Sequence, residues 1–398
     1  PQKPPKKPDF PEAGVELKVT PYKRTSKGIS AKERLVCNII DYMTEHEKTF
    51  ESSSFWHKCQ KMVIMSYKYE DGVAKGEFSI DNALLFTFPN EYRAVIKNDW
   101  EKIVAKIRAG EAHLLTEGDT LYLAACTKGK NSSSVRRQPF SKIPAKQRAY
   151  SLKASFMTNI LRRYIFGNEN DEKIIKDWHL LETNSLEGII EKKVSEYIGK
   201  TQRELKEKFN IDNSPKNLNM LLFSRMIGLS GDAERAHEFE NANIIPKTIC
   251  VDKDGSIKES MSFPAFKFCD IINETWEDSE LRNLIEPAKF LFVIFKKNDV
   301  DEPVFERIKF WNIPAEDLEK VKKVWERTVS IIKEGVQIET CGQKTKNNLP
   351  KSTESDVAHV RPHARKKSDT YPLPDGRELT KQCFWFNNAY VKKIIAES

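Results

Sequence analysis

Two acidic residues and a lysine near the start of the chain have the types and spacing of a site that could hydrolyse phosphodiesters. Six residues separate Asp9 from Glu16, and Lys18 follows two positions later. On a β-strand, residues i and i+2 point to one side, so Glu16 and Lys18 share a face while Leu17 turns to the core. Paired carboxylates suit Mg²⁺, and a lysine beside them can orient water or offset phosphate charge. The alternative interpretation is an edge strand with a Glu–Lys pair.

Composition bounds the class of protein. The chain has 398 residues, enough for two domains, and 39% of them are hydrophobic. No apolar run is long enough to span a bilayer, and "FLFVIF" (290–295) has the length of a buried strand. The seven cysteines include no CxxC pair, which excludes a zinc ribbon and indicates reduced thiols in the cytoplasm. The net charge of +8 is a modest hint of polyanion binding.

An internal repeat organises the chain. Segments recur in the same order roughly 225–235 residues later. The segment "WEKIVAKIRAGE" (100–111) matches "WERTVSIIKEGV" (325–336). The segment "AYSLKASFMTNIL" (149–161) parallels "CFWFNNAYVKKII" (383–395), and we expect an amphipathic helix at both of these places. "DFPEAGVELKVT" (9–20) lines up with "EFENANIIPKTI" (238–249). The sequence therefore predicts two related domains.

The two copies differ where chemistry would occur. Glu238 stands opposite Asp9, but Ile245 stands opposite Glu16, and 280–288, opposite Lys58, contains no lysine. Copy two is also preceded by helical sequence over 185–211 and 214–231, whereas copy one follows only a Pro/Lys arm. By comparison with its own second half, we expect the chain to lack roughly fifty residues at its N terminus.

The amino-acid sequence around the two carboxylates resembles that of a known family. Pro8-Asp9 with Glu16 and Lys18 has the form of the PD-(D/E)xK nuclease pattern, and "DFPEAGVELKVTPY" followed by "FESSSFWHK" resembles the MutH family. That family comprises the mismatch-repair nicking endonuclease and related GATC-specific type II restriction endonucleases. The two-copy layout, with "HVRPH" (359–363) and "KQCFWFNNAYVKK" (381–393), is similar to the restriction enzymes, in which a second MutH-like domain lacks a catalytic set.

The resemblance implies roles for individual residues. Asp9 and Glu16 would be Mg²⁺ ligands, with the Leu17 carbonyl a possible third, and Lys18 would be the motif lysine. Lys58, in "SSFWHKC", matches the family's additional active-site lysine. The family also has a glutamate on a helix before the motif, and no residue here matches it. Glu12 is the candidate replacement, but we interpret it as a loop carboxylate.

The resemblance also implies DNA contacts. The family reads bases with a loop around an Arg-Pro-Lys-like tripeptide and with an aromatic residue near the last helix. Copy two keeps a similar tripeptide, Arg361-Pro362-His363. In copy one only Lys128 matches the family's tripeptide, and Lys130 follows in the same predicted loop. The aromatic position falls on Ser151, with Tyr150 beside it, and the choice between them stays open. Lysine contacts to guanine in the major groove are chemically sensible.

Together these observations predict an α/β protein with the restriction-endonuclease-like PD-(D/E)xK fold, a mixed sheet flanked by helices, duplicated as two MutH-like domains. We place a catalytic domain at 1–175 and a non-catalytic DNA-binding or effector domain at 176–398. The implied function is Mg²⁺-dependent cleavage of double-stranded DNA at GATC, with self-association on DNA as one way to cut both strands. The alternatives are a mismatch-repair-type nickase and a DNA-binding form that is inactive through truncation.

Overall fold

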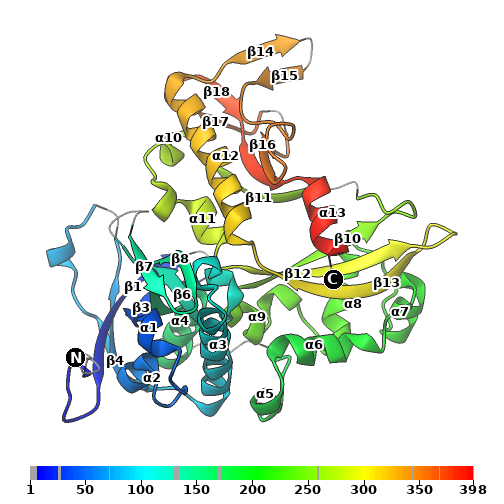
Figure 1. Ribbon diagram of the computed structural model, residues 1–398. Coiled ribbons are helices and arrows are strands. Elements are labelled where there is room, and N and C mark those ends of the chain that lie inside the picture. Colours follow the sequence, from blue (N-terminus) through cyan, green and yellow to red (C-terminus); the bar gives the residue numbers. More distant parts are fainter. Residues whose placement is uncertain are drawn as a thin grey trace. The chain divides into compact units, whose positions relative to one another are not determined.

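The structure is a computed structural model, which describes residues 7–25, 28–70, 72–129, 134–167, 172–257, 260–341, 344–366 and 368–397. The described chain forms two compact units (Figure 1). Unit 1 contains residues 1–248 and 287–293, and unit 2 contains residues 249–286 and 294–398. Among the described residues, no helix is long and apolar enough to cross a membrane.

Unit 1 begins with a mixed sheet that carries the Asp9–Lys18 segment. Its strands are ordered β2-β1-β4-β5, with β1 parallel to β4 and the other neighbours antiparallel. The strands are β1 (Glu16–Thr25), β2 (Gly28–Ala31), β4 (Lys61–Lys68) and β5 (Asn82–Thr87). The helix α3 (Asn90–Arg108) follows and buries a stripe at helical spacing that includes Val95, Trp100 and Ile107. The predicted mixed sheet flanked by helices is therefore confirmed in this unit.

The polar face of β1 is the inward face, contrary to the expectation that Leu17 turns to the core. Glu16 is 1% exposed, whereas Leu17 is half-buried and Val19 is 48% exposed. The inward face lies toward β3, because the side chain of Lys18 reaches the Cys37 carbonyl there. Alternation predicted correctly that Glu16 and Lys18 share a face, but it could not say which face is covered.

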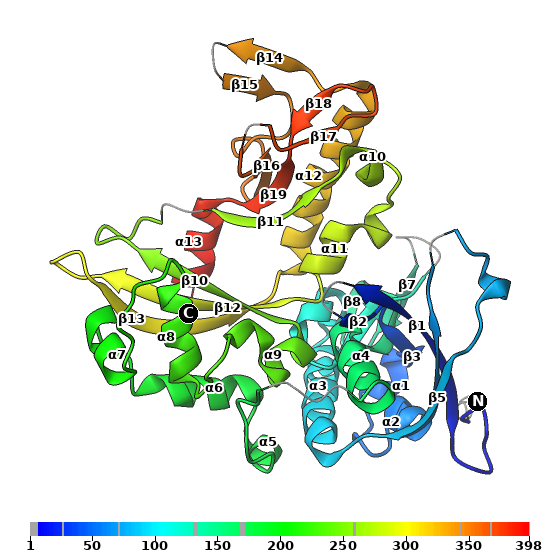
Figure 2. The ribbon, with the colours of Figure 1, turned by 180° about the vertical axis from the view of Figure 1, so that it is seen from behind.

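A second sheet of unit 1 has the order β3-β9-β6, and all its neighbours are antiparallel. Its strands are β3 (Leu35–Ile39), β6 (Leu123–Thr127) and β9 (Arg148–Leu152), and the hairpin β7 (Val135–Gln138) and β8 (Ser141–Lys146) lies between the last two in sequence. The short helices α1 (Tyr42–Glu45) and α2 (Ser54–Cys59) follow β3. Figure 2 shows α4 (Ala154–Ile160) beside β2, where the Ala31 amide donates to Thr158 Oγ1.

The helix expected over 149–161 begins later than the sequence suggested. Residues 148–152 are the central strand β9, and α4 begins at Ala154 and continues as a π-turn over Leu161–Ile165. The same correction applies to 383–395, where β19 (Gln382–Phe386) precedes α13 (Asn388–Ala396). An apolar run that is flanked by two strands pairs as a strand, because burial on both sides outweighs helical periodicity.

The helical segments predicted ahead of copy two are confirmed. They form α6 (Leu186–Ser195), α7 (Gln202–Lys208) and α8 (Leu218–Met226), between the short helices α5 (Leu180–Thr183) and α9 (His237–Ala242). Thr201 and Glu204 make reciprocal hydrogen bonds at the start of α7, which fixes where that helix begins. The chain then enters β10 (Ile244–Val251).

The second half of the chain repeats the order of elements seen in the first. A sheet ordered β10-β12-β13 is formed by β10, β12 (Lys289–Lys297) and β13 (Pro303–Trp311), and "FLFVIF" lies within the fully buried part of β12, as predicted. The long helix α12 (Ala315–Glu334) follows. A sheet ordered β11-β19-β16 then contains β11 (Met261–Phe266), β16 (Ala358–Pro362) and β19, all antiparallel neighbours.

The remaining elements of unit 2 are short. They are the helices α10 (Phe268–Ile271) and α11 (Glu280–Ile285) and two hairpins, β14 (Ile338–Cys341) with β15 (Lys344–Asn347) and β17 (Thr370–Pro372) with β18 (Glu378–Thr380). The division at 175/176 remains a prediction about related repeats, and the compact units divide the chain at other residues. Residues 1–6 of the N-terminal arm and residues 168–171 near the predicted boundary lie outside the described residues.

Candidate active site

A tight hairpin explains the spacing between the two carboxylates. Phe10 and Val15 exchange both backbone hydrogen bonds, at 2.9 and 3.1 Å, and Gly14 closes the turn with a φ of +63°. A left-handed residue at this place favours glycine. The hairpin thereby sets Asp9 opposite Glu16, which is the physical reason for six intervening residues.

Backbone amides tie the two carboxylates together. The Asp9 amide donates to Glu16 Oε2 at 3.2 Å, and the Leu17 amide donates to Asp9 Oδ2 at 3.1 Å. Asp9 is exposed, while Glu16 is buried at the first position of β1. One carboxylate of the pair thus faces solvent and the other is fixed within the fold.

Both predicted lysines converge on the buried carboxylate. Lys18 Nζ lies 2.9 Å and Lys58 Nζ 3.0 Å from Glu16 Oε1. Lys58 comes from the last turn of α2, whose start is capped by the Ser53 hydroxyl accepting from the Trp56 amide at 3.0 Å. The structure therefore brings together the four residues that the sequence singled out, Asp9, Glu16, Lys18 and Lys58.

The surroundings of Lys18 keep it protonated. Burial alone would lower its pKa, but the hydrogen bond to Glu16, aided by charge from Cys37, Cys59 and Glu16, raises the pKa above its ordinary value. Lys18 Nζ also donates to the Cys37 carbonyl at 3.1 Å. Sequence reasoning missed this partner, because a backbone carbonyl on a distant strand leaves no signal in the residue types.

The residues predicted to contact DNA in copy one differ in their exposure to solvent. Lys128 is exposed just after β6, with its amide bonded to the Gln147 carbonyl at 2.8 Å. Tyr150 and Ser151, on β9, are both 0% exposed, and their hydroxyls donate to Glu45 Oε1 at 3.4 Å and to the Ala124 carbonyl at 3.5 Å. Lys130 lies outside the described residues. In this conformation, only Lys128 of this set is both described and open to solvent.

In unit 2, the predicted Arg361 and His363 gather around a tryptophan. The Arg361 guanidinium lies 4.3 Å from the centroid of the Trp385 ring, and the His363 ring centroid lies 5.2 Å from it. Arg361 and His363 are exposed, while Trp385 is half-buried on β19. Sequence reasoning missed Trp385, although the parallel between 149–161 and 383–395 sets it opposite Ser151 and could have found it.

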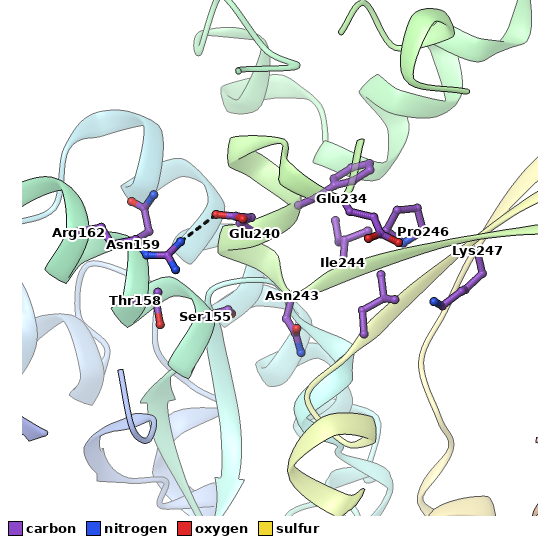
Figure 3. A pocket seen from close by; sticks show the side chains of 12 residues that line it. Ser155, Thr158, Asn159, Arg162, Glu234, Glu240, Asn243, Ile244, Pro246 and Lys247 are labelled. Atoms are coloured by element: carbon purple, nitrogen blue, oxygen red, sulfur yellow. Dashed lines mark hydrogen bonds and ion pairs between the residues drawn. The ribbon is translucent and has the colours of Figure 1, made fainter. Parts of the chain in front are cut away.

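A cavity of about 390 Å³ lies elsewhere in unit 1 (Figure 3). Its lining comes from α4 with the π-turn that follows, from α9 and from the start of β10, and Arg162 Nη1 reaches Glu240 Oε2 across it at 3.3 Å. None of Asp9, Glu16, Lys18 or Lys58 lines this cavity. The cavity and the carboxylate cluster are therefore separate features of unit 1.

The donor set suits a hard cation. Among the residues that the structure describes, no cluster of three or more His, Cys, Asp and Glu side chains could hold a metal ion. Two linked carboxylates with the Leu17 carbonyl fit Mg²⁺ nevertheless, because Mg²⁺ keeps several waters and takes only one or two protein carboxylates plus substrate phosphate.

Comparison with known proteins places these residues in context. Residues 2–99 match the family described as the DNA mismatch repair enzyme MutH. The chain is 40% identical to the type II restriction enzyme Sau3AI of Staphylococcus aureus over 434 residues, covering 98% of this chain and 88% of that enzyme. It is 30% identical to the DNA mismatch repair protein MutH of Shewanella woodyi over 159 residues, covering 39% of this chain and 68% of that protein. The MutH of Serratia proteamaculans is 26% identical over 164 residues.

Proposed function

Since the chain belongs to the family of type II restriction enzymes related to the mismatch-repair protein MutH, we propose that it cleaves double-stranded DNA at GATC with Mg²⁺. Membership in this family makes it a site-specific DNA endonuclease. One observation carries the assignment to particular residues: the hairpin and α2 bring two carboxylates and two lysines into a single cluster.

The cluster divides the chemistry between carboxylates and lysines. Asp9, Glu16 and the Leu17 carbonyl would hold the ion. When bound, Mg²⁺ supplies Lewis-acid activation of water and positive charge at the scissile phosphate. Lys18, 2.9 Å from Glu16, is placed to donate hydrogen bonds to the attacking water and to offset charge in the transition state. Lys58, which lies on α2, adds a second positive charge beside Glu16.

Base reading is proposed for the loop after β6 and for the neighbouring β9. Lys128 is exposed and suited to guanine acceptors in the major groove, and Lys130, two positions later in the sequence, is proposed to act with it. Either Ser151 or Tyr150 is proposed to act at the family's aromatic position, which requires β9 to become accessible on the DNA, because both are buried here.

We further propose that residues 176–398 are a second MutH-like domain without a catalytic set. Support comes from the matching element order and from the serines Ser53 and Ser279, which each cap the short helix before a central strand. On this alignment Ile245 and Lys247, which line the cavity of Figure 3, replace Glu16 and Lys18. The loss of the carboxylate supports a binding role rather than cleavage.

Arg361, His363 and Trp385 are the proposed DNA-facing group of this second domain, where they would bind an effector GATC site. An exposed guanidinium and imidazole beside an indole can contact phosphates and base edges. Binding of a second site raises the local concentration of chains on the DNA, which favours pairing of two catalytic domains across the palindrome.

Plasmid cleavage tests the proposed function. We expect a plasmid with GATC sites to be cut in Mg²⁺ but not with EDTA, and to become linear rather than remain a nicked circle. Lys18→Ala should abolish cleavage while GATC binding, measured by mobility shift, is retained. Persistent nicked circles would favour a mismatch-repair-type nickase, and binding without cleavage by the parent chain would favour the inactive DNA-binding form.

A further inference from the structure

Glu45, at the end of α1, is a fully buried carboxylate with no part in the metal cluster. Its Oε1 accepts from the Ser54 amide at 3.1 Å, from Trp100 Nε1 at 3.3 Å and from the Tyr150 hydroxyl at 3.4 Å. Its Oε2 accepts from Lys48 Nζ at 3.1 Å. A buried charge with this many donors is held in one position, because each lost partner would leave an uncompensated polar group.

One of these contacts and a further hydrogen bond to β3 meet at Ser54, the first residue of α2. The Ser54 amide donates to Glu45, and the Ser54 hydroxyl lies 3.0 Å from Asn38 Nδ2 on β3. Lys58 lies four residues further on, about 6 Å along the axis of a short helix. Ser54 therefore anchors the start of the helix that holds Lys58 3.0 Å from Glu16.

β3 also holds the other lysine. The pairing of β3 with β9 passes from Val36 opposite Ser151 to Asn38 opposite Tyr150, which leaves Cys37 as an extra residue. Such a bulge re-aims the backbone of its strand. Here the Cys37 carbonyl accepts from Lys18 Nζ at 3.1 Å. Lys18 directly, and the helix of Lys58 through Ser54, are thus bonded to consecutive residues of β3, Cys37 and Asn38.

The sheet that makes these contacts is also the one proposed to read bases. β9 carries Tyr150 and Ser151, and β6 leads into Lys128. The Tyr150–Glu45–Ser54 hydrogen bonds connect β9 to α2, and the pairing of β9 with β3 at Cys37 connects β9 to the carbonyl that accepts from Lys18.

The second half of the chain offers an internal comparison. On the proposed alignment, Trp325 stands where copy one has Trp100, and Phe384 stands where it has Tyr150. Trp325 Nε1 is buried and has no hydrogen-bond partner among the described residues, and phenylalanine has no hydroxyl to donate. The half that lacks the catalytic set therefore lacks the corresponding tryptophan and tyrosine hydrogen bonds as well.

We infer that Glu45 and Tyr150 are positioning residues that couple the β3-β9-β6 sheet to Lys58, so that cognate DNA on the sheet aligns α2 for cleavage. This inference rests on the proposed function, because it takes the sheet to be the base-reading element. Neither residue touches the reacting atoms; Glu45 and the Tyr150 hydroxyl act through α2, whatever contact the Tyr150 ring makes with bases.

Three variants test the coupling in the full chain. Tyr150→Phe removes only the hydroxyl, and Glu45→Ala removes the whole acceptor, whereas Glu45→Gln keeps an oxygen for the Ser54 amide. Tyr92→Phe is the matched control, because Tyr92 is equally buried and its hydroxyl donates to Asn159 outside this network.

We expect Tyr150→Phe to lower kcat on GATC duplexes about three- to tenfold, the effect of one hydrogen bond, and to change KM little, because phenylalanine keeps the aromatic ring at this position. The cleavage rate of a duplex with one altered base should stay the same. The ratio of the rates for the GATC duplex and the altered duplex should therefore decrease by the same factor. Glu45→Ala should lose about 100-fold through misplacement of Lys58, and Glu45→Gln should recover part of it. Equal losses on both duplexes, or no difference from Tyr92→Phe, would show a purely structural role.

Amide hydrogen exchange of residues 54–59 provides a measurement that needs no turnover. GATC duplex should slow exchange in the parent chain more than a scrambled duplex does, and Tyr150→Phe should abolish that difference while Tyr92→Phe keeps it. If the parent responds and Tyr150→Phe responds equally, the coupling is wrong and the proposed function stands. If the parent neither cleaves nor distinguishes the duplexes, the proposed function itself fails, and the inference with it.

Discussion

Lys58, from α2, and Lys18, from β1, contact the same carboxylate oxygen of Glu16, at 3.0 and 2.9 Å. Together with Asp9, which is linked to Glu16 through backbone amides, the two ammonium groups are balanced by two carboxylates, so a bound divalent cation would leave the cluster with net positive charge. That charge would suit an anion that arrives with the substrate, which for DNA is the scissile phosphate.

Lys58→Met tests that interpretation, because methionine keeps the apolar stem and removes only the charge. We expect the cleavage rate constant to fall at least about 100-fold, the usual effect of removing a transition-state donor, with GATC affinity changed only a few-fold. Single-turnover cleavage and mobility shift measure the two quantities. Lys97→Met is the control, since Lys97 is an exposed lysine on α3 whose Nζ lies 3.7 Å from Glu51. Comparable cleavage rates for Lys58→Met and Lys97→Met would show that Lys58 has no role in cleavage.

Asp9→Asn should weaken metal dependence. Asparagine preserves the shape of the side chain and an acceptor for the Leu17 amide, but it removes the exposed negative charge of the pair. We expect the Mg²⁺ concentration for half-maximal cleavage to rise at least about tenfold. Initial rates across a Mg²⁺ series give this value.

Glu12→Gln is the matched control for Asp9→Asn, because Glu12 is an exposed carboxylate in the same hairpin. Its Mg²⁺ dependence should equal that of the parent. A shift as large as that of Asp9→Asn would mean that the hairpin binds cations through its general charge rather than through Asp9.

The local part of the site could be predicted from the sequence, because its geometry is short-range. Strand alternation puts Glu16 and Lys18 on one side, and six residues between Asp9 and Glu16 accommodate the Phe10–Val15 hairpin. The long repeat likewise anticipated a second sheet-and-helix set in the same order. These inferences needed only periodicity and self-similarity.

The remainder depended on tertiary contacts that residue types do not encode. Which face of β1 is covered was predicted wrongly, since Leu17 and Val19 are the more exposed side. The bulge at Cys37 and the buried Glu45 are set by the packing of strands that are distant in sequence. The start of α4 was also misplaced, because Tyr150 reads equally well as a helical or a buried strand residue.

Lys153 should make the stability of the protein depend on pH. Burial lowers the pKa of this lysine from 10.5 to about 7, and its Nζ donates to the Thr120 and Pro287 carbonyls at 2.5 and 2.8 Å. Between these two pKa values the unfolded chain binds a proton that the folded chain does not. The free energy of unfolding contributed by this group therefore rises with pH over that window, by up to about 1.4 kcal/mol per pH unit.

Lys153→Met removes the titrating amine and keeps an apolar stem. Urea unfolding at pH 7.5 and 9.0, followed by tryptophan fluorescence, should show that the parent gains more stability than the variant, by up to about 2 kcal/mol. Since other groups titrate in both proteins, the comparison is the difference between them. The same gain in both would mean that Lys153 titrates alike in the folded and unfolded chains.

Arg361→Ala combined with His363→Ala should separate effector binding from catalysis. Both side chains flank the Trp385 ring in unit 2, and neither belongs to the carboxylate cluster of unit 1. We expect the double variant to cut DNA with many GATC sites at near-parental rates but to slow severalfold on a plasmid with one site. Added cleavage-resistant GATC duplex should stimulate the parent on the one-site plasmid and leave the double variant unchanged, because the second domain no longer holds that duplex. If the duplex stimulates both alike, the second domain is a structural remnant, and two chains must meet through their catalytic domains alone.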